Sequence, residues 1–187
     1  MLSPGKVYAF PGIYKGGHVS LFQMFFSAQG RIRRRDFWLW IIVAGIVNIS
    51  INYIANKLLN PGISMLQSIR SVNLLPSEPY DFIYWTILIF GHVIGFCLYA
   101  KRGHDRNRPA IIAGLYIVLN VCLTLLPKFM DVFMSQQSSS AVTGVMTTIS
   151  GIFGLAILID FGCLDGTKGP NRYGPSPKGI GGQAEVF

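Results

Sequence analysis

A short basic segment, residues 101–109, holds the side chains in this sequence that are best suited to chemistry. It reads KRGHDRNRP, so four basic residues flank His104 and Asp105. A histidine beside a carboxylate can exchange protons in acid–base catalysis, and the guanidinium forks of arginine suit phosphate groups. The segment is therefore compatible with two kinds of site: an enzyme centre on His104 and Asp105, and an anion site built from the arginines.

Two further segments can extend a site at residues 101–109. Residues 30–36 read GRIRRRD, and residues 166–175 read GTKGPNRYGP. If all three segments meet at one membrane face, their cations can bind anions or lipid headgroups. The candidate anion-binding residues are Arg31, Arg34, Arg102, His104, Arg108 and Arg172. A candidate structural polar network consists of Asp105, Asp160, Asn171 and Tyr173.

The elements that must position these residues are apolar. The chain of 187 residues is 51% hydrophobic and 13% charged, whereas soluble domains carry about 25% charged residues. Apolar runs cover about residues 37–59, 81–100, 110–126 and 141–162, and their lengths suit spanning helices of about 17–25 residues. The sequence predicts an all-α integral membrane protein with four transmembrane helices in a bundle, spanning residues 37–162.

The segments outside these helices differ in composition. Within the N-terminal segment, residues 1–36, residues 1–17 hold no apolar core of signal-peptide length. Residues 163–187 form a tail rich in glycine and proline that predicts turns. Residues 20–27, SLFQMFFS, are too short to cross a bilayer. Two alternatives stay open for them: a helix lying in the membrane interface, or a short helix packed on the bundle.

The charges predict an orientation. Four spans place residues 1–36, residues 101–109 and the tail on one side of the membrane. That side holds 13 of the 16 lysines and arginines, and the other side holds only Lys57, Arg70 and Lys128. Because cytoplasmic loops are enriched in lysine and arginine, both termini are predicted to be cytoplasmic.

Several polar residues fall inside the predicted helices. Asn48, Asn52 and Asn56 recur every four residues and therefore share one helix face, which should contact other helices. His92 lies near the middle of the second helix, and Asn120 lies in the third. Hydrogen bonds between helices explain these residues, and the alternative is a polar pathway through Asn48, Asn52, His92 and Asn120.

Asp160 and the cysteines complete the candidate sites. Asp160 lies near the end of the fourth helix, where a carboxylate needs a partner; we expect a basic residue from residues 101–109 or 31–35. Cys97, Cys122 and Cys163 show no metal-binding or disulfide spacing. Neither a metal site nor a cofactor is expected.

Three motifs resemble those of the DUF805 family, small bacterial inner-membrane proteins of unknown function. The chain has FSAQGRIRRRDFW at 26–38, KRGHD at 101–105 and GTKGPNRYGP at 166–175. They are similar to the family patterns F-x-G-R-x-x-R-x-x-F/Y-W, R-R-L-H-D and G-T-x-G-x-N-x-Y-G-P. Gly103 replaces a leucine, and residues 109–111 depart from the usual S-G-W. The resemblance implies a four-helix protein of the bacterial inner membrane, and it implies no activity, cofactor or catalytic residue.

The functional prediction is a non-enzymatic multi-pass protein with a basic cytoplasmic face. This face is expected to bind anionic lipid headgroups or to support envelope assembly or regulation. The alternatives are a membrane enzyme acting on a lipid phosphate through His104 and Asp105, and a small oligomeric transporter using His92. Membrane lipids are the expected partners, and a homo-oligomer or a membrane-protein partner stays open. Nucleic acid is not expected, because the basic residues flank apolar runs.

Overall fold

The chain is described by a computed structural model that covers residues 21–133 and 136–178. Within these ranges the chain is helical and forms no β-strand. The elements are α1 (Leu21–Phe26), α2 (Arg34–Leu59), α3 (Met65–Ser71), α4 (Pro79–Asp105), α5 (Ala110–Phe133), α6 (Gln136–Leu158) and η1 (Ile159–Cys163), a π-helical turn.

Four helices are long and apolar enough to cross a membrane. These spans cover Arg34–Leu59, Pro79–Asp105, Ala110–Met130 and Ala141–Cys163, with mean hydropathy between 1.8 and 2.2. This confirms the prediction of an all-helical chain with four apolar helices. Only 6–11% of the residues in these apolar stretches are buried inside the molecule, so their outer surfaces require an apolar environment.

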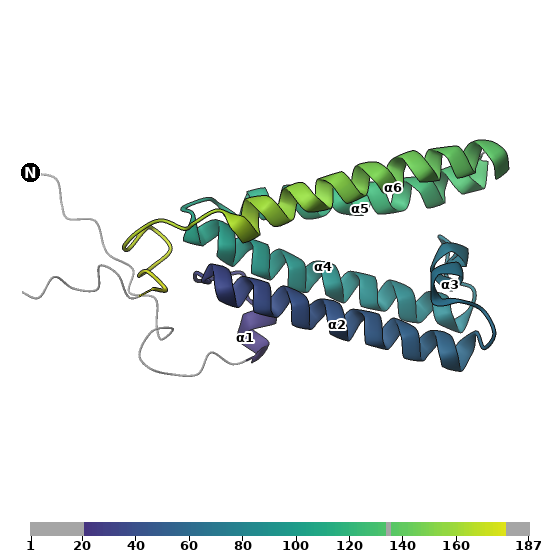
Figure 1. The fold of residues 1–187 in the computed structure, drawn as a ribbon, viewed down its shortest axis with the longest axis horizontal. Helices are drawn as coiled ribbons and strands as arrows, with labels where there is room; N and C mark the ends of the chain where they lie inside the picture. Colours follow the sequence, from purple (N-terminus) through teal and green to yellow (C-terminus); the bar gives the residue numbers. More distant parts are fainter. Residues whose placement is uncertain (1–20, 134–135, 179–187) are drawn as a thin grey trace, which may run out of the picture.

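The long helices pack in the order α2–α4–α5–α6. Contacts join α2 to α4, α4 to α5 and α5 to α6, and η1 returns to contact α2 at one end. Figure 1 shows α5 and α6 leaning away from α2 and α4 toward the opposite end, which carries α3. The predicted bundle is therefore closed mainly at the end that holds η1.

The largest apolar core lies at this closed end. Phe37 of α2, Leu98 of α4, Ile157 of α6 and Phe161 of η1 form a buried cluster with Ile32. A second cluster, near α3, contains Ala55, Val72 and Tyr80. Because Phe161 belongs to the first cluster, the end of α6 is fixed against both α2 and α4.

At two places the helices extend beyond the apolar runs that the sequence shows. Residues 101–109 are helical as far as Asp105, which ends α4, and only the remainder forms a turn. The charged side chains do not end the helix because the protein itself supplies partners for them. Residues after Pro127 also stay helical, with α5 extending to Phe133 and α6 beginning at Gln136. A proline removes a single backbone donor, and α5 continues past that interruption.

The asparagine face of α2 lies partly against protein, and one contact with another helix is made by Ser68 of α3, whose Oγ donates to Asn56 Oδ1. Asn52 and Asn56 are buried. Asn52 Nδ2 donates to Asn48 O at 2.9 Å, and Asn56 Nδ2 donates to Ile63 O at 3.0 Å. These bonds satisfy the Nδ2 donors of both side chains, which would otherwise face hydrocarbon.

Candidate functional site

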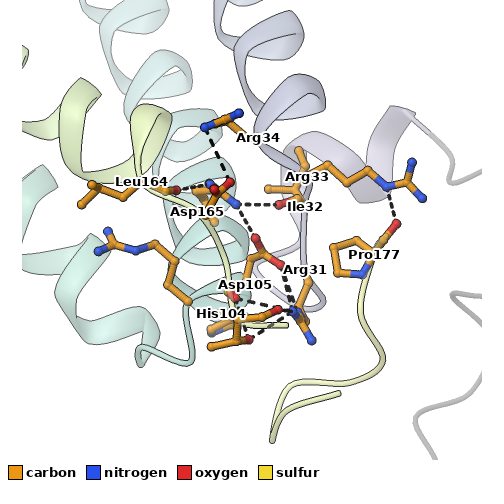
Figure 2. Close-up of polar contacts among 12 residues, drawn as sticks. Arg31, Ile32, Arg33, Arg34, His104, Asp105, Leu164, Asp165 and Pro177 are labelled. Atoms are coloured by element: carbon orange, nitrogen blue, oxygen red, sulfur yellow. Dashed lines mark hydrogen bonds and ion pairs between the residues drawn. The ribbon is translucent and has the colours of Figure 1, made fainter. Parts of the chain in front are cut away.

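Asp105 is the centre of a buried charge cluster at the closed end of the molecule. The residue is only 3% exposed. Arg31, from the loop before α2, places Nη2 at 3.0 Å from Asp105 Oδ1, and Arg102 pairs through Nη1 with Asp105 Oδ2. Figure 2 shows Arg31 pointing at this carboxylate. We call Arg31, Arg102 and Asp105 the arginine clamp; since one carboxylate serves two guanidiniums, the arginines need further acceptors.

Arg102 finds these acceptors on the chain that follows α6. Its side chain is almost fully buried. Nε donates to Phe161 O at 2.7 Å, Nη2 donates to Leu164 O, and Nη1 lies 3.5 Å from Ile32 O. A single guanidinium from α4 therefore ties η1 to the segment that precedes α2.

The backbone at the end of α6 is satisfied by side chains from other helices. A helix end leaves four carbonyl groups without partners in the helix, and cations are favourable there. In this protein the carbonyls of five consecutive residues, 160–164, accept side-chain hydrogen bonds. The donors are Arg106 to Asp160 O, Arg102 to Phe161 O and Leu164 O, Trp38 to Gly162 O, and Arg34 to Cys163 O.

Residues 164–178, which we call the C-terminal strap, fold back over the clamp. Arg31 Nη1 donates to Gly169 O at 3.0 Å and to Gly174 O at 3.1 Å, and Nη2 donates to Thr167 O at 3.1 Å. Thr167 N donates to Asp105 O at 2.8 Å. Arg31 thus binds backbone carbonyls of the strap, as Arg102 binds a backbone carbonyl of η1.

Gly166 allows the strap to approach Asp105 closely. A Cβ atom at this position would lie 1.9 Å from Asp105 Oδ2 and 2.9 Å from Asp105 O. These distances are far below van der Waals contact, so only glycine fits without a shift of the strap.

His104 is the second contact point of the strap. Its ring stacks on Tyr173, with ring centroids 3.9 Å apart and planes inclined by 12°. Asn171 Nδ2 donates to His104 O at 2.9 Å. His104 Nδ1 lies 3.1 Å from Gly30 O, and because a carbonyl only accepts hydrogen bonds, Nδ1 carries a proton.

Asp160 forms a second ion cluster beside the clamp. Its Oδ1 lies 2.6 Å from Arg106 Nη1, and its Oδ2 lies 2.7 Å from Arg108 Nη1. Both arginines belong to residues 101–109, one of the two segments expected to supply its partner. The pairs are half-buried, with Asp160 18% exposed and Arg108 36% exposed, so they stabilise the turn after α4.

The segments that meet at the clamp lie within one family match. The model of the family described as "Protein of unknown function (DUF805)" matches residues 25–175. The chain belongs to the DUF805 family. The resemblance seen in the three motifs is thereby confirmed.

Two relatives from Escherichia coli (strain K12) extend over most of the chain. "Uncharacterized protein YiiR" is 28% identical over 162 residues, covering 84% of this chain and 90% of the relative. "Inner membrane protein YhaI" is 24% identical over 161 residues, covering 86% and 94%. No solved structure matches the chain significantly. The name of the second relative and the four apolar helices together indicate a bacterial membrane protein.

The anion-site candidates of this DUF805 protein fall into two groups. Arg31, Arg102 and His104 are buried and bind within the protein. Arg34, Arg108 and Arg172 are more accessible. The Arg34 side chain is 51% exposed, and Arg172 places its guanidinium 4.8 Å from the Tyr173 ring centroid.

The side chains of His104 and Asp105 bind different partners in this DUF805 protein. Asp105 gives its two carboxylate oxygens to Arg31 and Arg102, while His104 Nδ1 faces the carbonyl of Gly30. Within the described part of the chain, no group of three or more His, Cys, Asp or Glu side chains is arranged to hold a metal ion.

The intramembrane polar residues form two small pairs. His92 Nδ1 lies 2.7 Å from Leu88 O, and His92 Nε2 lies 3.2 Å from Asn120 Oδ1. The histidine therefore links α4 to α5. Asn48 and Asn52 bond to each other on α2. The His92–Asn120 pair joins two helices, and the Asn48–Asn52 pair lies within α2. A polar pathway through these residues stays a prediction.

Sequence reasoning missed four contributors to the clamp region. An aromatic residue such as Trp38, at the start of an apolar run, is expected at the membrane boundary, yet its Nε1 donates to Gly162 O at 2.9 Å. Gly162 must be small, because a Cβ there would lie 2.6 Å from the Trp38 ring. Gly166 and Thr167 belong to the third DUF805 motif, which identified their segment but not their contacts with Asp105.

Proposed function

We propose that this protein is a multi-pass protein of the bacterial inner membrane whose closed end faces the cytoplasm. At this end it binds anionic lipid headgroups, without catalysing a reaction, and so supports envelope assembly or regulation. The main support is the separation of its cations into a buried set, used by the fold, and an exposed set at the same end.

The exposed set surrounds the clamp. The side chains of Arg34, Arg35 and Lys178 are 51%, 85% and 50% exposed, and Lys168 and Arg172 are also exposed. Among the described lysines and arginines, Lys57, Arg70 and Lys128 lie at the far end. A basic residue near an anionic membrane surface contributes about 1 kcal/mol, so the closed end favours anionic lipid far more than the far end.

The enzyme alternative gains no support from the geometry. A general base must be oriented by a partner and lie open to its substrate. The Asp105 carboxylate is taken by two arginines, and Tyr173 covers one face of the His104 ring. We therefore retain lipid binding as the function to test.

Removing exposed cations from the closed end should weaken the preference for anionic lipid. We expect Arg35→Gln combined with Lys168→Gln to lower the phosphatidylglycerol-to-phosphatidylcholine binding ratio roughly 30-fold, since two charges near the surface, about 1 kcal/mol each, are lost. Native mass spectrometry of the purified protein in mixed lipid and detergent measures this ratio. The matched control, Lys57→Gln with Arg70→Gln, removes two exposed cations from the far end and should leave the ratio unchanged. Equal ratios in the two variants, or no preference in the unaltered protein, would contradict the proposal.

The proposed orientation predicts which cysteines an impermeant reagent reaches. In a chain with Cys97, Cys122 and Cys163 replaced by serine, Leu75→Cys reports on the far end, where Leu75 is 81% exposed. Lys168→Cys reports on the strap. A membrane-impermeant maleimide should label Leu75→Cys in intact spheroplasts and Lys168→Cys only after permeabilisation. The reverse pattern would show that the closed end faces outward.

A further inference from the structure

Helix α1 has two faces with different surroundings. It lies crosswise to α2 near the closed end (Figure 1) and contacts α4. On the inner face, Met24 packs against the core cluster, and the ring of Phe25 meets Trp40 edge-on at a centroid distance of 5.0 Å. Lys101 Nζ donates to Gln23 O at 2.7 Å and to Met24 O. The protein therefore holds α1 firmly from one side.

The outer face of α1 is apolar and exposed. Leu21, Phe22 and Phe26 are 61%, 71% and 41% exposed, and the two phenylalanine rings stack on each other at 5.1 Å. Side chains of this kind avoid water unless another apolar surface covers them.

The position of Phe26 shows which part of the membrane-spanning helix α4 lies beside α1. Its ring centroid is 6.5 Å from that of Phe90 in α4. Phe90 precedes Lys101 by eleven residues, about 16 Å along a helix. Phe90 is itself 54% exposed and belongs to the apolar surface of the span Pro79–Asp105. The outer face of α1 is thus continuous with a surface that requires an apolar environment.

We propose that α1 is an in-plane membrane helix whose Leu21, Phe22 and Phe26 side chains contact the acyl chains of the leaflet next to the closed end. The exposed arginines at residues 33–35 follow α1 after a six-residue connection, residues 27–32, which places cations near the inserted rings at headgroup level. The proposal combines the two sequence interpretations of residues 20–27, with one face of the helix packed on the bundle and the other in the membrane interface.

Lys101 fixes the depth of this helix. A helix of six residues is not stable alone, so α1 depends on its contacts with α2 and α4. The Lys101 ammonium is buried, with the residue 5% exposed, and it binds carbonyls of α1, where a cation complements the helix dipole. The membrane contact needs no anionic lipid, so it does not rest on the proposed headgroup binding.

A spin label at Phe22→Cys, in the cysteine-free chain reconstituted in pure phosphatidylcholine vesicles, tests the proposal. Power-saturation spectroscopy compares collisions with oxygen, which concentrates in the acyl region, and with a water-soluble nickel chelate. We expect high oxygen and low nickel accessibility, as for a reference label at Ile89→Cys, and the opposite for a label at Lys168→Cys. High nickel accessibility at residue 22 would overturn the proposal. Low accessibility to both would also overturn it, because residues 1–20 or a second copy would then cover the face.

The role of Lys101 is tested with the same label. Lys101→Met should make the label at residue 22 more mobile and raise its nickel accessibility several-fold, whereas Lys101→Arg should retain the original depth. The label at Ile89→Cys serves as the fold control in each variant, and its accessibility should not change. An unchanged label at residue 22 in Lys101→Met would show that the ammonium does not hold α1. If the unaltered protein showed no phosphatidylglycerol preference while the label at residue 22 lay at the expected depth, only the headgroup proposal would be refuted.

Discussion

Asp105→Asn should lower the free energy of unfolding by about 3–5 kcal/mol, the range for leaving a buried charge without its partner. The asparagine keeps the shape of the side chain but removes the charge that two buried guanidiniums share. Arg31 and Arg102 then face only neutral acceptors in a site where Asp105 is 3% exposed. The measurement is denaturation of the purified protein in detergent micelles, followed by tryptophan fluorescence.

Asp165→Asn is the matched control for this prediction. Asp165 also pairs with two cations, Arg34 at 3.5 Å and Lys178 at 3.8 Å, but its side chain is 68% exposed. Exposed pairs contribute about 0–1 kcal/mol, so this variant should unfold almost as the unaltered protein does. If the two asparagine variants had the same stability, the clamp would not be a main source of stability at the closed end.

Features that depend on neighbouring residues could be predicted from the sequence. The four apolar helices follow from their length and composition, and the buried face of α2 follows from the four-residue spacing of its asparagines. The need of Asp160 for a basic partner follows from the cost of a carboxylate at a helix end. The sequence narrows this partner only to two segments, and the partners in the structure, Arg106 and Arg108, lie 54 and 52 residues away. What could be predicted in each case comes from the residues of a single helix.

Features that depend on distant partners could not be predicted. Arg31 and Asp105 are separated by 74 residues, and Arg31 and Gly174 by 143. Composition makes residues 101–109 look like a solvated loop, because nothing local shows that carbonyls from η1 and the strap will receive the arginine side chains. For the same reason, the sequence cannot separate the buried arginines, Arg31 and Arg102, from the exposed ones, Arg34 and Arg172. It predicts all four as members of one anion site.

These distant contacts also explain how an open row of helices acquires a closed end. α6 contacts α5 along its length, while η1 and the strap connect its end to α2 and α4. The carbonyls that Arg31 and Arg102 bind belong to chain that follows α6. The strap is therefore part of the fold at this end, although its sequence, rich in glycine and proline, predicts only turns.

Gly166→Ala should release the strap from the clamp. The added Cβ would lie 1.9 Å from Asp105 Oδ2, 2.4 Å from Asp105 Cγ and 2.9 Å from Asp105 O. Overpacking of this kind costs about 1–3 kcal/mol, which corresponds to a roughly 10–100-fold rise in the undocked strap. Trypsin should then cleave after Lys168 and Arg172 faster by a similar factor, as measured by mass spectrometry of the C-terminal fragments.

Two comparisons make this prediction specific to the contact between Gly166 and Asp105. Gly144→Ala adds a methyl group where no atom lies within 4 Å, so cleavage of the strap should not change. In an Asp105→Ala background the Oδ2 and Cγ atoms are absent, and Gly166→Ala should add much less to the cleavage rate than it does alone, because contacting sites are not additive. Equal effects of Gly166→Ala in both backgrounds would mean that its cost arises in the strap backbone or at the Asp105 carbonyl, 2.9 Å from the added Cβ, and not at the carboxylate. A smaller effect beside Asp105→Ala would assign that cost to the close approach at Asp105, the carboxylate on which both buried arginines depend.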